Sequence, residues 1–136
     1  MVERALHTAF DESAIRRLLA THGGCYSKST VVDLMGLKNA STIDRWCEHR
    51  QIIAVRDEAE EWVFPIWQFA KRQRRVMLGI RDCLAELAFE DESEPVNFFL
   101  STLDSLGGHT PLDRLRAGKI EAAILAARYY ASEIQR

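Results

Sequence analysis

The sequence predicts a mostly α-helical protein that carries one small two-stranded β-hairpin. Three observations predict this class. Apolar residues recur at helical spacing through most of the chain, glycine or proline bounds most of these stretches, and two β-branched and aromatic runs flank an acidic turn. The 136 residues allow one domain of ordinary size or two very small ones, and a content of 47% hydrophobic and 28% charged residues is typical of a globular fold.

A first helix is predicted between Asp11, whose side chain can cap its amino end, and Gly23-Gly24, which supply the stop. Its apolar stripe consists of Ala14, Ile15, Leu18 and Leu19. A second, shorter helix is predicted to open on Thr30 and Asp33, which form a capping-box pattern, and to end at Gly36.

A third helix is predicted from Thr42 to His49. Ser41 and Asp44 form a second capping-box pattern at its start. Only residues 36–40 separate it from the second helix, and this short turn contains a glycine, as in a helix-turn-helix. Helical spacing turns Ile43, Trp46 and Cys47 inward, whereas the outward set is Thr42, Asp44, Arg45, Glu48 and His49.

The β-hairpin follows directly. Its two predicted strands are Ile52–Arg56 and Trp62–Phe64, and the five residues Asp57–Glu61 make an acidic tip. An isolated two-stranded hairpin is only marginally stable in water, so we expect this one to pack against the helices as a wing. Pro65 then permits a helical start at Ile66–Phe69.

The second half of the chain is predicted to be entirely helical. One helix runs from about Arg74 to Phe89, with an apolar side formed by Met77, Ile80, Cys83, Leu84 and Leu87. Glu90–Glu94 interrupts the pattern as an acidic linker and is the best candidate boundary in the chain. The fold class is therefore a winged helix-turn-helix, residues 1–73, followed by a small helical region, residues 74–136.

Closely spaced turn residues mark the end of the chain. Gly107-Gly108 can take positive φ, Thr110 can cap a short helix with Pro111 at its first position, and Gly118 can end it. Leu112 and Leu115 point to one side of this short helix. A last helix is predicted from Lys119 to Gln135, and every glycine and proline in this stretch has a local structural role.

Several classes of function lack their signatures. The chain has no run of about 18 apolar residues and no signal-peptide layout, so we expect a cytoplasmic protein without a membrane partner. The spacing of Gly107-Gly108 matches no phosphate-binding motif, and no catalytic motif is present, so we expect neither an enzyme nor a cofactor. The three cysteines are widely spaced; a zinc site built from His22, Cys25, Cys47 and His49 is conceivable but matches no known finger spacing, and we expect no metal.

Charge and patterning favour a nucleic-acid partner for the first half. Residues 28–56 carry five basic against three acidic side chains, whereas residues 82–133 carry ten acidic against four basic ones, and a basic cluster at 71–75 adds to the front. A polar second helix with Arg45 suits the major groove of DNA. The candidate DNA-binding residues are Lys38, Asn39, Thr42, Arg45, His49, Arg50 and Arg56. An exposed helical hairpin that binds no DNA fits the same pattern.

Two stretches resemble known bacterial proteins. Residues 29–68, with "TIDRW", "IIAV" and "WVFPIWQF", resemble the winged helix-turn-helix of small regulators of the MerR and excisionase sort. The stretch "FFLSTLDSLGGHTPLDRLRAGKIEAAILAA" is similar to the toxin-binding domain of the Xre/MbcA/ParS antitoxins, in which glycine, proline and leucine recur at fixed spacings. Unlike the MerR type, the sequence His49-Arg50-Gln51 holds no glycine to end the recognition helix.

This resemblance implies an antitoxin with two functions: the front half would bind operator DNA and repress its own operon, and the back half would bind a RES-type toxin. The implied toxin contacts are Leu106, Gly108, Pro111, Leu112, Leu115 and Gly118, to which the aromatic side chains of Tyr129 and Tyr130 add anchors. Leu112 and Leu115 could equally bury in the core. A homodimer is expected, since one recognition helix makes few contacts. The alternative is a standalone regulator with a dimerisation or ligand-sensing carboxyl-terminal domain.

Overall fold

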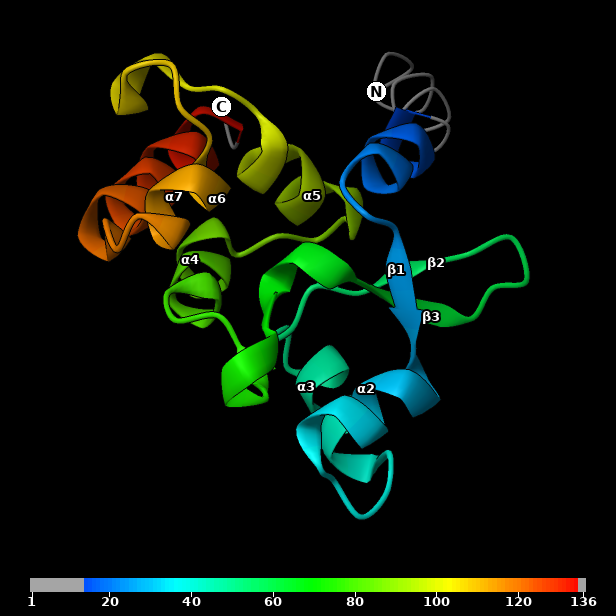
Figure 1. Ribbon diagram of the computed structural model, residues 1–136. Helices are drawn as coiled ribbons and strands as arrows, with labels where there is room; N and C mark the ends of the chain where they lie inside the picture. Colours follow the sequence, from blue (N-terminus) through cyan, green and yellow to red (C-terminus); the bar gives the residue numbers. More distant parts are fainter. Residues whose placement is uncertain (1–13, 135–136) are drawn as a thin grey trace.

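A helix at residues 14–21 begins the described part of the computed structural model, which covers residues 14–134 (Figure 1). Ile15 and Leu19 are buried, as their spacing predicts. The helix stops in a turn where Gly23 and Gly24 have φ values of 99° and 81°, a conformation that costs glycine little. Asp11, the predicted cap, lies outside the described residues.

A three-stranded antiparallel sheet lies beneath this helix, in the order β1-β3-β2. Its strands are β1 (Cys25–Ser27), β2 (Val55–Arg56) and β3 (Trp62–Pro65). The predicted hairpin is confirmed as β2 and β3, with Val55 opposite Val63. Strand β1, in which Tyr26 pairs with Phe64, is an addition to the prediction, because three residues are too few to show alternation.

The N-cap of helix α2 (Lys28–Met35) lies three residues before the predicted cap, Thr30. Ser27, not Thr30, is the N-cap: its hydroxyl accepts a hydrogen bond from the Thr30 amide at 3.2 Å. The capping-box prediction at Thr30 and Asp33 is therefore wrong, since a serine three residues upstream already meets the free amide. Gly36 ends the helix with φ 67°, as predicted.

Helix α3 (Ser41–Glu48) also starts differently from its prediction. Ala40 is the N-cap and makes no side-chain cap bond. Asn39 Oδ1 instead accepts from the Ser41 amide at 2.9 Å and from the Ser41 hydroxyl. Asp44 is drawn to Lys28, so the predicted capping box of Ser41 and Asp44 does not form.

A second hairpin follows the wing and replaces the first part of the helix predicted from Arg74. One 3-10 turn, Ile66–Gln68, leads into β4 (Phe69–Ala70), a second turn at Lys71–Gln73, and β5 (Arg75–Val76). The strands pair with Phe69 opposite Val76. Helix α4 (Ile80–Leu87) consequently starts six residues later than predicted, because Arg75–Val76 bonds to another strand instead of continuing a helix.

Four helical elements complete the chain: α5 (Ser93–Leu100), the 3-10 turn Asp104–Leu106, α6 (Pro111–Arg116) and α7 (Ile120–Ile134). The predicted acidic linker is shorter than expected because Ser93 and Glu94 belong to α5. The predicted cap of α6 is confirmed: Thr110 Oγ1 accepts from the Asp113 amide at 3.0 Å, and Pro111 holds the first helical position. The fold is thus mostly helical, a winged helix-turn-helix followed by a small helical region, as predicted.

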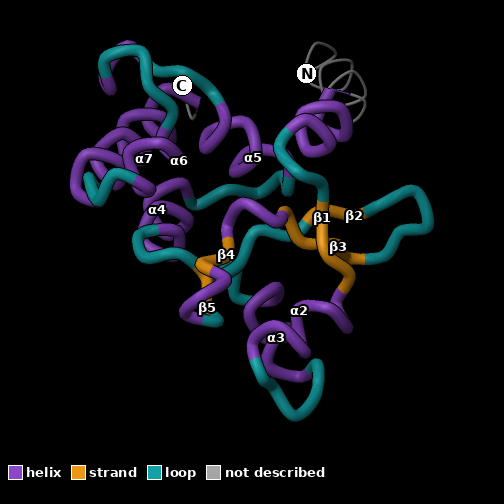
Figure 2. Tube along the Cα trace, viewed as in Figure 1, coloured by secondary structure: helices purple, strands orange, loops and turns teal. Residues whose placement is uncertain are grey.

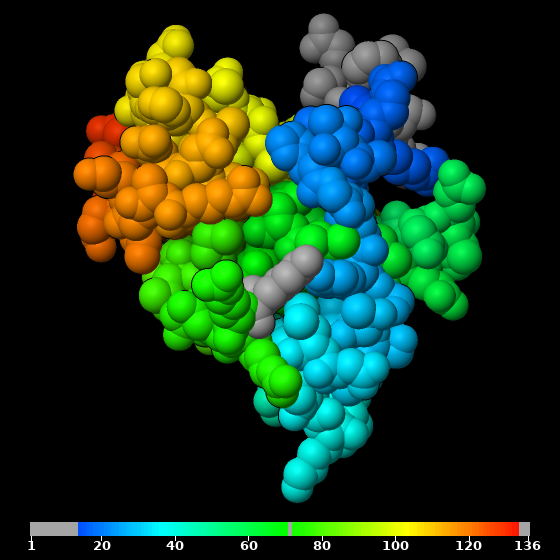
Figure 3. Space-filling view, viewed as in Figure 1, coloured from blue at the N-terminus to red at the C-terminus, as the bar shows by residue number. Residues whose placement is uncertain are grey.

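Two hydrophobic cores hold these elements. The small core joins α2, α3 and the strands through the buried residues Val31, Ile43, Ile52, Phe64 and Phe69. The large core contains residues of the first helix, the wing and α4 to α7 together, so the front and back of the chain share one interior. Helices α2 and α3 lie at one extreme of the molecule and α6 and α7 toward the other (Figures 1 and 3). Within residues 14–134, no helix has the length and apolar character needed to span a bilayer.

Candidate nucleic-acid interface

The exposed face of α3 is the first candidate site. Ile43 is fully buried in the small core, and Trp46 and Cys47 are half-buried beside it, so this side of the helix faces inward as predicted. The opposite side presents Arg45 and His49 to solvent. Packing on the inner side therefore fixes the helix while its polar side stays accessible.

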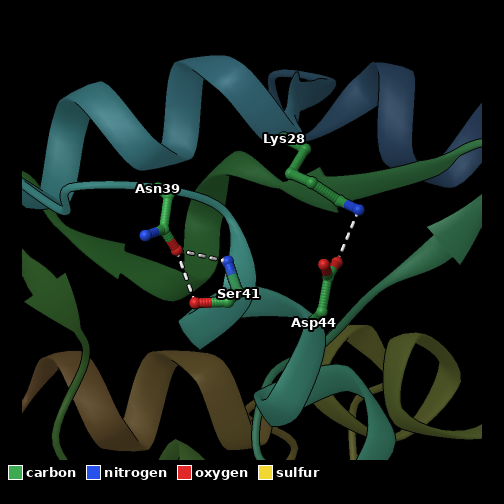
Figure 4. Close-up of polar contacts among 4 residues, drawn as sticks. All are labelled: Lys28, Asn39, Ser41 and Asp44. Atoms are coloured by element: carbon green, nitrogen blue, oxygen red, sulfur yellow. Dashed lines mark hydrogen bonds and ion pairs between the residues drawn. The ribbon is translucent and has the colours of Figure 1, made fainter.

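Two polar contacts hold α3 against α2 and the turn between them (Figure 4). Lys28 Nζ lies 2.6 Å from Asp44 Oδ1 and joins the start of α2 to the first turn of α3. Asn39 holds the amide of Ser41 from the turn. An exposed ion pair contributes at most about 1 kcal/mol, so the effect of Lys28 is mainly to orient the helix and to compensate one of the two acids, Asp44, on its polar face.

The structure groups most of the predicted DNA-binding residues. Lys38 and Asn39 are exposed on the turn, Arg45 and His49 are exposed on α3, and Thr42 is half-buried at its start. Lys28 belongs with this group but was missed, since the sequence gives no signal for a contact between residues 16 positions apart.

Arg50 and Arg56 are held away from this face. The Arg50 guanidinium lies 5.6 Å from the centre of the Phe89 ring, and both residues line a pocket together with Cys47, which is on the inward side of α3. The Arg56 guanidinium lies 4.6 Å from the Trp62 ring and 3.6 Å from Glu60. Both arginines thus contact aromatic rings near the wing, and the structure does not bring them to the exposed face of α3.

The end of α3 explains how the chain does without a terminating glycine. Arg50 itself adopts φ 56°, in the left-handed region, and the Gln51 amide donates to the Trp46 carbonyl at 2.8 Å. This is the hydrogen-bond pattern that glycine ordinarily provides after a helix.

The tip of the wing is acidic and well ordered by its own hydrogen bonds. Asp57 Oδ1 accepts from the amides of Ala59 and Glu61 at 2.9 and 3.0 Å. Glu58 and Glu60 are exposed beside it. A phosphate backbone would be repelled by this tip, so the tip of the wing is not a candidate contact with nucleic acid.

The predicted toxin contacts divide by burial. Leu106, Pro111, Leu112 and Leu115 are buried against this chain's own core, because the short α6 must turn its one apolar side toward α5 and α7. Tyr130 is half-buried, with its ring 5.2 Å from that of Phe98. Gly108, Gly118 and Tyr129 are exposed, Tyr129 to 59%.

A further apolar residue on α7 was missed by the sequence analysis. Leu125 is 46% exposed and lies one helical turn before Tyr129, with the exposed Ala122 one turn before it. The i, i+4 spacing of Leu125 and Tyr129 was a signal that could have found this face. Of the two last helices, α7 and not α6 therefore presents large apolar side chains to solvent; Leu78, just before α4, is the other exposed large apolar residue of residues 74–134.

The cysteines are free thiols: Cys25 and Cys47 are half-buried and Cys83 is buried. Burial raises the pKa of the Cys25 and Cys47 thiols to about 11 and that of Cys83 to about 12, so they remain protonated near neutral pH. Among residues 14–134, no group of three or more histidine, cysteine or acidic side chains could hold a metal ion.

One cavity of about 500 Å³ lies between the first helix, the wing and the start of α5. Its floor is apolar and its rim is charged; it is lined by Ile15, Arg16, Leu19, Val55, Arg56, Asp57, Glu60 and residues 90–93. This volume falls within the range of small-molecule sites.

Comparisons with known proteins add information on the fold alone. No model of a known protein family matches the chain, and no curated protein matches it significantly. Among solved structures, the fold is similar to the NMR structure of Rv2175c, with a TM-score of 0.62, 20% sequence identity, and coverage of 79% of this chain and 80% of that chain. The shared class is a helical fold with a small antiparallel sheet.

Proposed function

We propose that this protein is a DNA-binding repressor that acts as the antitoxin of a toxin–antitoxin pair in the cytoplasm. The observation that carries the DNA-binding part is the accessible polar face of α3, which packing on Ile43 and the contacts of Lys28 and Asn39 hold in place. Arg45, exposed in the middle of this face, would read a base edge, because arginine donates two hydrogen bonds to guanine. Lys38 would contact a phosphate.

The antitoxin part of the proposal assigns toxin binding to the back half. It is supported by the glycine, proline and leucine spacing of residues 98–131 and by the exposed Leu125 and Tyr129 on α7. Since Leu112 and Leu115 stabilise this chain's own interior, the proposed contact with a RES-type toxin runs through α7 and the exposed turns at Gly108 and Gly118. In this proposal the chain is a homodimer, and it catalyses no reaction itself.

One experiment tests both parts, because each has its own exposed residues. The chain is coexpressed with a RES-type toxin from the neighbouring gene, and the purified chain is titrated with DNA from its own promoter. Arg45→Ala should weaken DNA binding by about 1–3 kcal/mol and leave growth rescue intact. A double variant, Leu125→Ala and Tyr129→Ala, should lose rescue and toxin pull-down but keep DNA affinity.

The two variants are controls for each other, and circular dichroism spectra of both are compared with the wild type to check that they fold. Unchanged affinity of Arg45→Ala would overturn the assignment of α3. A wild-type chain that binds DNA but neither rescues growth nor retains the toxin would overturn the antitoxin part. That outcome favours a standalone regulator, for which the 500 Å³ cavity beside the wing offers a ligand site.

A further inference from the structure

The hairpin of β4 and β5 carries a basic turn that none of the residues proposed above includes. Arg72, Arg74 and Arg75 are all exposed. Within residues 14–134, none of the three belongs to an ion pair, in contrast to Lys28, Arg16 and Arg56. Three unpaired guanidinium groups within four residues concentrate positive charge at one point of the surface.

The hairpin that carries this basic turn packs in the same hydrophobic core as α3. Phe69, in β4, is buried in the small core together with Val31 of α2 and Ile43 of α3. The ring of Tyr26 in β1 lies 5.8 Å from that of Phe69, and the amide of Met77 donates to the Gln68 carbonyl at 2.8 Å. Both ends of the hairpin are therefore anchored, and its turn is held at a fixed place relative to α3.

The turn lies beside the junction of α2 and α3. A Cβ built on Gly36, the residue that ends α2, would lie 3.8 Å from Arg74 Nη1. Gly36 opens the turn that contains Lys38, so the two basic groups flank the same loop. Figure 2 shows β4 and β5 on one side of the α2–α3 pair and the tip of β2 and β3 on the other.

The two hairpins thus differ in charge. The β2–β3 tip carries four acids, whereas every charged residue of the β4–β5 turn is basic. We propose that Arg72, Arg74 and Arg75 form a second contact with duplex DNA, binding the phosphate backbone beside the groove that α3 enters, in the role that the acidic wing does not fill. This inference rests on the proposed DNA binding, and it names further residues for that site.

Salt dependence tests the proposal, because each phosphate that a protein neutralises steepens the fall of affinity with salt by about 0.9 log units. The probe is a fluorescent random-sequence duplex of about 30 base pairs, since backbone contacts need no particular sequence. The variant combines Arg72→Gln, Arg74→Asn and Arg75→Gln; asparagine is chosen because Arg74 has φ 50° and asparagine tolerates that conformation. We expect the slope to fall by about 2–3 and the affinity at low salt to fall at least tenfold.

A matched control changes net charge equally on helices that lie away from α2 and α3 (Figure 1): Arg17→Gln in the first helix, and Arg116→Gln and Lys119→Gln at the α6–α7 corner, all exposed. It should retain the wild-type slope. If the triple variant melts early, the double variant Arg72→Gln and Arg75→Gln, which leaves Arg74 beside Gly36, should still lower the slope by about 1–2.

The outcomes separate this inference from the proposed function. A wild-type chain that binds no duplex at any salt concentration overturns DNA binding itself. A wild-type chain that binds, together with a folded variant of unchanged slope, overturns only the role of the basic turn. If the control variant loses as much DNA affinity and salt slope as the arginine variant, the effect is one of overall charge. If the wild-type chain binds single-stranded RNA more tightly than the duplex, duplex DNA is the wrong partner. Either result overturns the inference.

Discussion

Gly79 occupies the most crowded glycine position of the described chain, directly before α4. Its φ is 96°, and a Cβ built there would lie 2.5 Å from Leu115 Cδ2 and 3.2 Å from Ile120 Cγ2. The absence of a side chain lets α4 start against the α6–α7 corner. The Leu115 side chain fills the space beside Gly79 and is buried there, so it packs within this chain's own core.

We expect Gly79→Ala to lower the free energy of unfolding by about 2–4 kcal/mol, from left-handed strain together with overpacking. Gly118→Ala is the matched control, because Gly118 has φ 79° but nothing within 4 Å of its Cβ position. It should cost about 1–2 kcal/mol, the strain alone. Urea denaturation measures both, and equal losses would contradict the crowding at Gly79.

At the scale of elements, α3 is positioned by side chains that lie outside it. Asn39 precedes the helix and bonds its first amide, and Lys28 at the start of α2 pairs with Asp44. Both contacts act on the amino-terminal turn, from which the face with Arg45 extends. The same small core also receives Phe69 from the second hairpin, so α3, the wing and the second hairpin pack against one another.

Replacing Asn39 with alanine should therefore destabilise the protein by about 0.5–2 kcal/mol, the usual effect of losing a side-chain cap. Ser41→Ala should cost less, because it removes only the exposed hydroxyl bond to Asn39 and leaves the bond from the Ser41 amide to Asn39 Oδ1 in place. Thermal melts of the two variants compare them directly. If Ser41→Ala loses more stability than Asn39→Ala, the Ser41 side chain caps α3, as the sequence predicts, and Asn39 does not.

At the scale of the whole molecule, the shared large core couples the winged helix-turn-helix, for which we propose DNA binding, to the helical region that follows it. Trp67, which follows the wing, is 4% exposed, and its ring lies 5.8 Å from that of Phe99 in α5. Ile53 and Val55 belong to the same core as Ala123 and Ala127 of α7. The predicted boundary near residue 73 thus separates two stretches of sequence that fold against one another.

We expect one cooperative unfolding transition. All three tryptophans, Trp46, Trp62 and Trp67, lie before residue 73, so their fluorescence reports on the front region, whereas far-UV circular dichroism reports on all helices. The two curves should coincide, and Phe99→Leu in the back region should shift both equally. If Phe99→Leu shifts the midpoint seen by circular dichroism but not the midpoint seen by fluorescence, the two regions are not coupled.

Signals within a few residues of one another predicted much of this protein correctly. The stops at Gly23-Gly24 and Gly36, the β2–β3 hairpin, the inward side of α3 and the cap at Thr110 were all predicted from the sequence. The capping boxes at Thr30 and Ser41 failed because Ser27 and Asn39 compete for the same amides. Residue types alone do not decide which of several nearby oxygens meets an amide.

The sequence by itself determined the fold class and the polar face of α3, because helical periodicity, glycine φ and hairpin patterns act over a few residues. Only the tertiary structure decided that β1 joins the sheet, that Lys28 meets Asp44, that Leu112 and Leu115 are buried while Leu125 and Tyr129 are exposed, and that a basic turn lies beside Gly36. The physical reason is that these contacts form only when distant segments pack together. Which apolar side chains are left accessible depends on the volume that those segments enclose, and no local pattern encodes that volume.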